Sequence, residues 1–188
     1  RTGPYVTEAD GALDWYRIAI AGADFGYARA SIGAGGEDTR FAANWRGMYA
    51  ADMARGAVHI WSLCHLASDQ ATNFLETVPP DPAALPSAID FAFRADCPAR
   101  PGRDILLSEL GRFLSAVEGR TGKAVILRLS PEFDAHYDVS ATVERPLWMI
   151  RALRRPDYGA RPPRLWEASP FARIDGATDA LRWLGRAR

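Results

Sequence analysis

The stretch Ser87-Ala88-Ile89-Asp90-Phe91-Ala92-Phe93 decides how the rest of the chain is interpreted. Its five apolar residues follow Pro86 and favour a strand buried on both faces, as the strands of parallel sheets are. Asp90 is a carboxylate that an ordinary protein core does not accept without a partner. If the strand belongs to a barrel, Asp90 lies at the mouth, where sites are built.

The residue two positions after Asp90 carries the second part of the argument. Side chains two apart on a strand point the same way, and glycan cleavage commonly uses two carboxylates that face one bond. Here that position holds Ala92. The stretch therefore predicts the architecture of a site without its chemistry.

Composition limits the class of protein. The 188 residues are 48% hydrophobic, which suffices for one core, and we expect a single domain over residues 1–188. A formal net charge of zero gives no reason to expect a nucleic-acid or anionic-membrane partner. No apolar run approaches the roughly 20 residues that a bilayer span requires. The chain starts at Arg1 without a leader pattern, so we expect any signal peptide or anchor to have been removed or to lie outside this sequence.

Cys64 and Cys97 are the two cysteines. Taken alone, the pair is compatible with a disulfide, with two buried thiols or with part of a metal site. His65 and Asp96 adjoin them, but no Cys-x-x-Cys spacing supports zinc. We expect no metal and no cofactor.

Strand and helix patterns alternate along the first two thirds of the chain. Asp38 is expected to cap a helix that runs to about Arg55, and Ser68 is expected to cap another. Aromatic and apolar residues of the first of these helices fall on one face, namely Phe41, Trp45, Met48 and Tyr49. The expected strands are residues 3–7, 25–31, 56–61, 87–93 and 124–129, and the other expected helices are residues 13–21, 69–78 and 104–120.

The last third has a different pattern. Residues 146–150 and 164–168 are strand-like, residues 178–181 form a weak eighth strand, and no convincing helix lies between them. Five strand–helix units followed by three strands predict a parallel sheet with right-handed crossovers that closes into an eight-stranded barrel.

Several short motifs in a fixed order resemble those of the glycoside hydrolase family 25 muramidases, lysozymes that cut the glycan of peptidoglycan. The resemblance covers nearly the whole chain and implies a modified TIM-like (β/α)5(β)3 barrel in the α/β class. The segments that carry it are Gly3 to Gly11, Leu13-Asp14-Trp15, Ala21 to Phe25, Phe41-Ala42-Ala43-Asn44-Trp45, Gly56-Ala57-Val58-His59, Gln70 to Phe74, and Gly122-Lys123 through Ser130-Pro131.

The same resemblance identifies which working acids have changed. The aspartate of the family's opening strand is Tyr5, and the Asp-x-Glu pair is Asp90 and Ala92, so the general acid is lost. The aspartate of the closing motif is retained as Asp179. The residues that line the site also depart from the family pattern, at Ile32, Val58, Arg128, and Trp166-Glu167-Ala168.

These changes predict a pseudoenzyme. Removal of a positioned general acid costs on the order of 100- to 10,000-fold in rate, and alanine has no proton to donate. Adjacent strands place Arg128 beside Asp90, where a guanidinium favours the ionised carboxylate. The alternative is an active muramidase with reassigned carboxylates, Asp90 with Asp179, Glu8 or Glu167. The structural interpretation of Asp90 and Asp179, as hydrogen-bonded remnants that hold loops, stays open.

The resemblance further implies a partner and a compartment. We expect peptidoglycan glycan, or an envelope protein, at the degenerate barrel mouth, and an exposed apolar patch near Val58, Ile32 and Ala168 would favour the protein. A Cys64–Cys97 disulfide joins neighbouring loops and implies an extracytoplasmic bacterial location, periplasmic or secreted. Trp61, Trp148 and Trp166 are candidate surfaces on which the glycan stacks, with barrel filling as the alternative for each, and Arg128 is a candidate partner for a lactyl or peptide carboxylate of the ligand. His59 is structural in the family. The candidate binding residues are Glu8, Arg29, His59, Trp61, Arg128, Trp148, Trp166 and Glu167.

Overall fold

Nine strands form one sheet that closes on itself. A computed structural model of the chain describes residues 1–151, 156–169, 176–177 and 180–184. The strand order is β1-β9-β8-β7-β6-β5-β4-β2-β3, and a further β1–β2 pairing closes an eight-stranded barrel with β3 attached to β2. The strands are β1 Thr2–Val6, β2 Phe25–Ile32, β3 Gly36–Glu37, β4 Ala54–Ile60, β5 Ala88–Phe91, β6 Ile126–Leu129, β7 Leu147–Ile150, β8 Leu165–Ser169 and β9 Ala180–Trp183.

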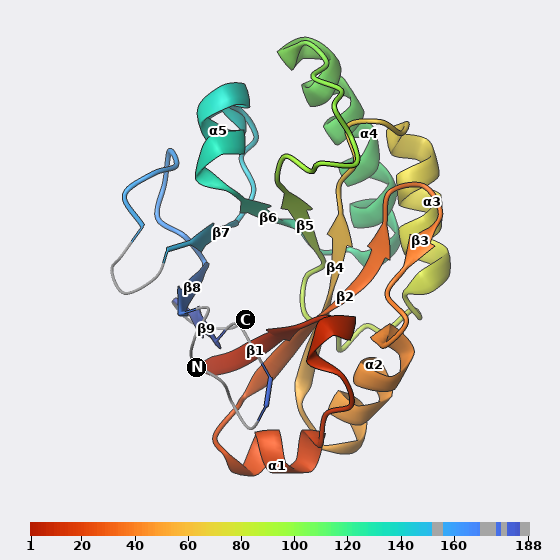
Figure 1. Cartoon of the computed structure of the whole chain (residues 1–188), viewed down its shortest axis with the longest axis vertical. Coiled ribbons are helices and arrows are strands. Elements are labelled where there is room, and N and C mark those ends of the chain that lie inside the picture. Colours follow the sequence, from red (N-terminus) through yellow and green to blue (C-terminus); the bar gives the residue numbers. More distant parts are fainter. Residues whose placement is uncertain (152–155, 170–175, 178–179, 185–188) are drawn as a thin grey trace.

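The helices are distributed unevenly around this barrel. In Figure 1, α2, α3 and α4 lie along the side formed by β2, β4 and β5, whereas α5 stands above β6 and β7. The helices are α1 Trp15–Ile20, α2 Phe41–Ala50, α3 Ala67–Thr77, α4 Arg103–Thr121, α5 Pro131–Tyr137 and α6 Val139–Thr142, with a 3-10 turn η1 at Glu8–Asp10. The predicted barrel of the α/β class is confirmed.

Side-chain alternation along the strands gives two apolar layers. One fills the barrel and includes Tyr5, Tyr27, Val58, Trp148 and Trp183. The other lies between the barrel and the helices. Tyr27 and Trp148 are fully buried. Large aromatic rings therefore fill the barrel, and they support the polar groups at its mouth.

The last strand contradicts the prediction of a parallel sheet. β9 runs antiparallel to both β8 and β1, with Thr2 opposite Arg182 and Leu165 opposite Trp183. It occupies residues 180–183, later than the predicted 178–181, and residues 178–179 lie outside the described part. The short connection after β8 explains the direction, because a parallel crossover needs a dozen or more residues and usually a helix.

The predicted helix from Asp38 to Arg55 was wrong at both ends. α2 ends at Ala50, and β4 begins at Ala54. Arg40 occupies the N-cap position, while the Asp38 carboxylate accepts from the backbone N–H groups of Glu8 and Arg40. Tyr49 is 71% exposed, beneath the Arg55 guanidinium, rather than on the inward face.

The starts of three further helices also differ from the prediction or were not predicted. Leu66, not Ser68, is the N-cap of α3. α5, for which no bounds were predicted, is the helix of the fifth strand–helix unit, and α6 follows it. Ser130 caps α5 by accepting from the backbone N–H of Phe133, with Pro131 at the first helical position.

Candidate functional site at the barrel mouth

The inward-facing residues at the carboxyl ends of β5, β6 and β8 form one ionic cluster. In the sheet register Asp90 is opposite Arg128, and Arg128 is opposite Trp148. Arg128 Nη1 donates to Asp90 Oδ1 at 2.8 Å, and its Nε and Nη2 donate to Glu167 Oε2 at 3.1 and 2.9 Å. The side chains of these three residues are only 5–11% exposed. One guanidinium thus bridges two buried carboxylates.

A second arginine completes the cluster. Arg94, in the loop after β5, donates from Nη2 to Asp90 Oδ2 at 3.0 Å. Trp148 Nε1 donates to Glu167 Oε2 at 3.2 Å from inside the barrel. Burial opposes the charge on Arg128, but the Asp90 and Glu167 carboxylates outweigh burial and raise the pKa of Arg128 above its ordinary value. Two carboxylates and two guanidinium groups leave the cluster neutral.

Tyr5 occupies the position at which the resembled family has an acid. Its ring meets Trp148 edge-on with 5.3 Å between centroids, and the Arg128 Cζ lies 5.3 Å from the Tyr5 ring. Burial, followed by the nearby Asp90 charge, raises the pKa of the Tyr5 phenol far above its ordinary value. Tyr5 therefore stays neutral and acts as a wall of the cluster.

Ala92 lies one residue beyond the end of β5. It lines a small pocket at the mouth together with Ile32, Trp61, Arg94 and Asp96. A methyl group at this point provides neither a proton nor a charge for a bound substrate.

A second cluster stands beside the first at the end of β2. Arg29 Nε donates to Asp38 Oδ2 at 2.7 Å, and Arg29 Nη2 lies 3.0 Å from Glu8 Oε1. Glu8 also accepts from the Thr39 hydroxyl at 2.9 Å. The Thr39 hydrogen bonds, aided by Arg29, lower the pKa of Glu8. Glu8 is therefore an ionised anchor for the η1 turn, unsuited to deliver a proton near neutral pH.

His59 is a buried structural residue. Its Nδ1 lies 2.7 Å from Ser31 Oγ and its Nε2 lies 3.1 Å from Gln70 Oε1. Its ring stacks on Phe113 with 5.0 Å between centroids. Burial lowers the pKa of His59 to about 4 from 6.5. The imidazole is neutral at pH 7 and belongs to the scaffold.

This depressed pKa predicts a loss of stability in acid. The unfolded histidine takes up a proton near its ordinary pKa of 6.5 and the folded one only near 4, so the contribution is present above pH 6.5 and lost as the pH falls to 4. Between pH 7 and pH 4.5 the free energy of unfolding should fall by about 2 kcal/mol more in the wild type than in His59→Gln, which has no imidazole. Urea unfolding of both proteins at the two pH values measures the difference. Equal falls would show that His59 is not the titrating group.

The tryptophans divide between core and surface. Trp148 is fully buried inside the barrel, and Trp61 is 3% exposed and packs on Phe91 and Phe113. Of the two roles considered for Trp148, its complete burial fits barrel filling. Trp61 packs between the barrel and the helices, and part of its surface lines the pocket that contains Ala92. Trp166 is partly exposed and donates from Nε1 to the Arg151 carbonyl.

The structure also shows where other residues predicted at the mouth lie. Val58, one of the residues whose exposure would have favoured a protein partner, is fully buried in the barrel. Arg128 was expected to meet a ligand carboxylate, but its Nε, Nη1 and Nη2 already donate to protein carboxylates. Asp179 and the side chain of Ala168 lie outside the described part of the chain. Arg94 was missed, although an arginine four residues after Asp90 was a readable signal.

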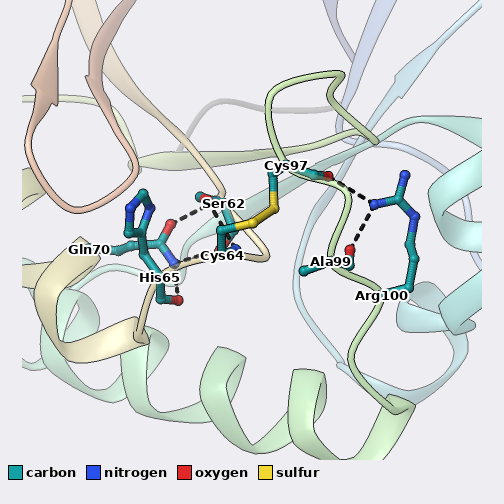
Figure 2. The surroundings of a disulfide bond; sticks show 7 residues. All are labelled: Ser62, Cys64, His65, Gln70, Cys97, Ala99 and Arg100. Carbon is teal, nitrogen blue, oxygen red and sulfur yellow. Dashed lines mark hydrogen bonds between the residues drawn. A yellow bond between two sulfur atoms is a disulfide. The ribbon is translucent and has the colours of Figure 1, made fainter.

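The two cysteines form a disulfide with a Cα–Cα distance of 5.9 Å. It joins the loop after β4 to the loop after β5 (Figure 2). Gln70 binds the first loop through Ser62 and His65, and Arg100 Nη1 donates to the Cys97 carbonyl at 3.0 Å in the second. The crosslink therefore fixes one rim of the pocket that Ala92 lines.

Within the described residues no cluster of three or more histidine, cysteine or acidic side chains is arranged to hold a metal ion. Among those same residues no helix is long and apolar enough to cross a membrane.

Comparison with curated proteins finds relatives without an assigned activity. The uncharacterized protein YegX of Escherichia coli O6:H1 is 30% identical over 171 residues, which is 87% of this chain and 61% of that protein. YegX of the K12 strain is 29% identical over the same coverage. The chain thus spans 61% of the length of these two relatives.

Comparison with solved structures shows the same fold. A family 25 glycosyl hydrolase from Bacillus anthracis superimposes with a TM-score of 0.88 at 26% identity, over 98% of this chain and 89% of that one. A bacterial lysozyme from Streptomyces coelicolor superimposes with a TM-score of 0.90 at 21% identity, over 99% and 93%. The sequence profile of the family "Glycosyl hydrolases family 25" matches residues 6–168. This chain therefore belongs to glycosyl hydrolase family 25.

Proposed function

We propose that this protein is a non-hydrolytic member of its family that binds peptidoglycan glycan at the degenerate barrel mouth. The observation that carries the proposal is the Asp90–Arg128–Glu167 bridge beside Ala92. Hydrolysis of a glycosidic bond needs one carboxyl group that holds a proton and another that faces the anomeric carbon. Here the guanidinium of Arg128 binds the carboxylates of both Asp90 and Glu167.

An active muramidase would need two other carboxyl groups at the mouth that are free to act on the glycosidic bond. Glycosidase carboxyl pairs stand roughly 5–9 Å apart with sugar or water between them. Asp90 and Glu167 instead have an arginine between them, and the guanidiniums of Arg94 and Arg128 donate to the two oxygens of Asp90. Glu8 is held by Arg29 and Thr39. In the pairs Asp90 with Glu8 and Asp90 with Glu167, every carboxyl oxygen therefore already contacts a protein donor.

The ligand and location follow from the family and the pocket. Family 25 membership makes peptidoglycan the substrate-type partner, and the Ala92 pocket provides apolar walls together with the charged groups of Arg94 and Asp96. Sugars are commonly bound by such mixed surfaces. A peptidoglycan ligand and the disulfide favour an extracytoplasmic, cell-envelope location. An envelope protein is the alternative occupant of the mouth.

The decisive experiment measures hydrolysis and binding on the same purified sacculi. We expect neither turbidity clearance nor soluble muropeptide release from the wild type, and saturable co-sedimentation with the sacculi. Ala92→Trp should weaken this co-sedimentation, because it fills the mouth pocket without removing a hydrogen bond. Ala135→Trp on the exposed surface of α5 is the matched control and should bind as the wild type does.

Two outcomes would overturn the proposal in different ways. Muropeptide release that disappears in Asp90→Asn would make this an active hydrolase. Absence of both release and binding would exclude the glycan as ligand and direct the search to an envelope protein.

A further inference from the structure

The opposite end of the barrel contains a larger pocket than the mouth. Its volume is about 950 Å³, within the range of small-molecule sites. It lies where β6 and β7 begin and where β9 ends, and Ile126, Leu147 and Trp183 are its buried apolar residues. Nothing in the proposed function uses this end of the molecule.

Positive charge is concentrated on this pocket. Among the described residues that line it, five have cationic side chains, Arg1, Lys123, Arg145, Arg161 and Arg164, and one, Glu144, has a carboxylate. Arg145 is neutralised by Glu118, with Nε–Oε1 at 2.7 Å. If Arg145 and Arg164 are both left out of the count, Arg1, Lys123 and Arg161 remain beside Glu144, which is an excess of two positive charges. Since the whole chain has zero net charge, this excess is a local feature.

The cations are held in place by backbone carbonyls. Lys123 Nζ donates to the Pro82 carbonyl at 2.6 Å and to that of Ala84. Arg161 donates to the carbonyls of Ser140, Val143 and Arg145. These bonds position the charges without cancelling them, because a carbonyl carries only a partial charge. The side chains therefore do not have to be ordered when an anion binds.

Trp183, which lines the same pocket, has an indole N–H without a hydrogen-bond partner among the described residues. The side chain is 7% exposed, and its Nε1 has no hydrogen-bond acceptor among the described residues. Buried donors in native proteins nearly always have a partner, so an orphan beside a pocket points to a ligand that supplies one.

We propose that this pocket binds a ligand that carries a phosphate group on an apolar body. A phosphate monoester brings close to two negative charges, which matches the excess of two cations counted above. The attraction comes from the charges of Arg161 and Lys123, which their bonds to neutral carbonyls leave in place. The apolar residues contribute through burial of the hydrocarbon part of the ligand. The phosphate can come from a lipid headgroup or from a soluble phosphate ester, and the two sources differ in the apolar part.

Calorimetric titration of the intact chain separates these sources. The probes are glycerol phosphate, dihexanoyl phosphatidate and, as the zwitterionic control, dihexanoyl phosphatidylcholine. We expect phosphatidate to bind most tightly, glycerol phosphate more weakly and phosphatidylcholine not at all, with affinities that fall as salt is added. Equal binding of phosphatidate and glycerol phosphate would overturn the apolar part of the proposal. Phosphatidylcholine also has a phosphate, but a diester whose charge choline balances, so equal binding of phosphatidate and phosphatidylcholine would overturn the proposed preference for a phosphate monoester with net negative charge.

Substitutions localise the binding. Ala124 is exposed on the pocket wall, so Ala124→Glu adds a carboxylate without removing any side-chain contact, and it should weaken phosphatidate by about tenfold or more. Ala135→Glu makes the same charge change on α5 and should have no effect. If Ala124→Glu fails to fold, Ala83→Glu on the same wall replaces it. Unchanged affinity in the folded variant would overturn the proposal, and Ala92→Trp at the mouth should leave phosphatidate binding intact whatever its effect on sacculi.

Discussion

Replacement of Arg128 by methionine is expected to lower the free energy of unfolding by about 3–5 kcal/mol. The change leaves Asp90 and Glu167 as two neighbouring buried carboxylates, of which Glu167 loses its only guanidinium partner among the described residues. Methionine replaces the apolar stem but none of the hydrogen bonds. Because protonation of one carboxyl removes the repulsion, the deficit should shrink as the pH is lowered. Urea unfolding at several pH values measures both effects.

Arg145→Met provides the matched control. Arg145 binds Glu118 through two contacts of 2.7 and 2.9 Å, but its side chain is 33% exposed. Exposed pairs of this kind contribute about 0–1 kcal/mol. If Arg128→Met is no more destabilising than Arg145→Met, the mouth cluster is not the buried ionic bridge described above. The triple change that also replaces Asp90 by Asn and Glu167 by Gln should recover part of the loss.

The second large effect is expected from removal of the disulfide. Cys64 and Cys97 are 33 residues apart, and the loop-entropy relation gives about 4 kcal/mol for a crosslink of that span. The double variant Cys64→Ser, Cys97→Ser should lose about that amount, as measured by urea unfolding. Reduction of the wild type should produce a similar loss without any substitution. A loss below about 1 kcal/mol in both experiments would mean that Gln70 and Arg100 already fix the two loops.

The mouth cluster could be predicted in part from the sequence. Asp90 and Arg128 lie on strands that follow one another in the chain, and such strands are usually neighbours in a barrel. The sequence therefore predicted that the two side chains meet, and the structure shows this contact. The participation of Glu167 as an equal partner was harder to foresee. It depends on the tilt that brings β8 across the barrel, a property of closure that no local pattern contains.

Other errors have local physical causes. The 3.6-residue periodicity carried the second helix through Ala51 and Asp52, where the chain turns and Asp52 adopts a φ of 55°. Asp38 looked like a helix cap because aspartate prefers that position, but Arg29, nine residues earlier, also binds its carboxylate, and Arg40 takes the N-cap position. The direction of β9 could not be inferred, since strand propensity does not say which way a strand runs.

That last strand also determines when the molecule can become a barrel. β1 and β9 pair across almost the entire chain, so the contact that joins the two edges has the greatest sequence separation in the sheet. Contacts of high separation form late, because the loop entropy must be overcome before they provide any stabilisation. Until β9 is in place, the strands from β1 to β8 can pair only as an open sheet whose edges are β1 and β8. Unpaired edges of this kind can pair with other chains, so closure by β9 also protects the protein against association.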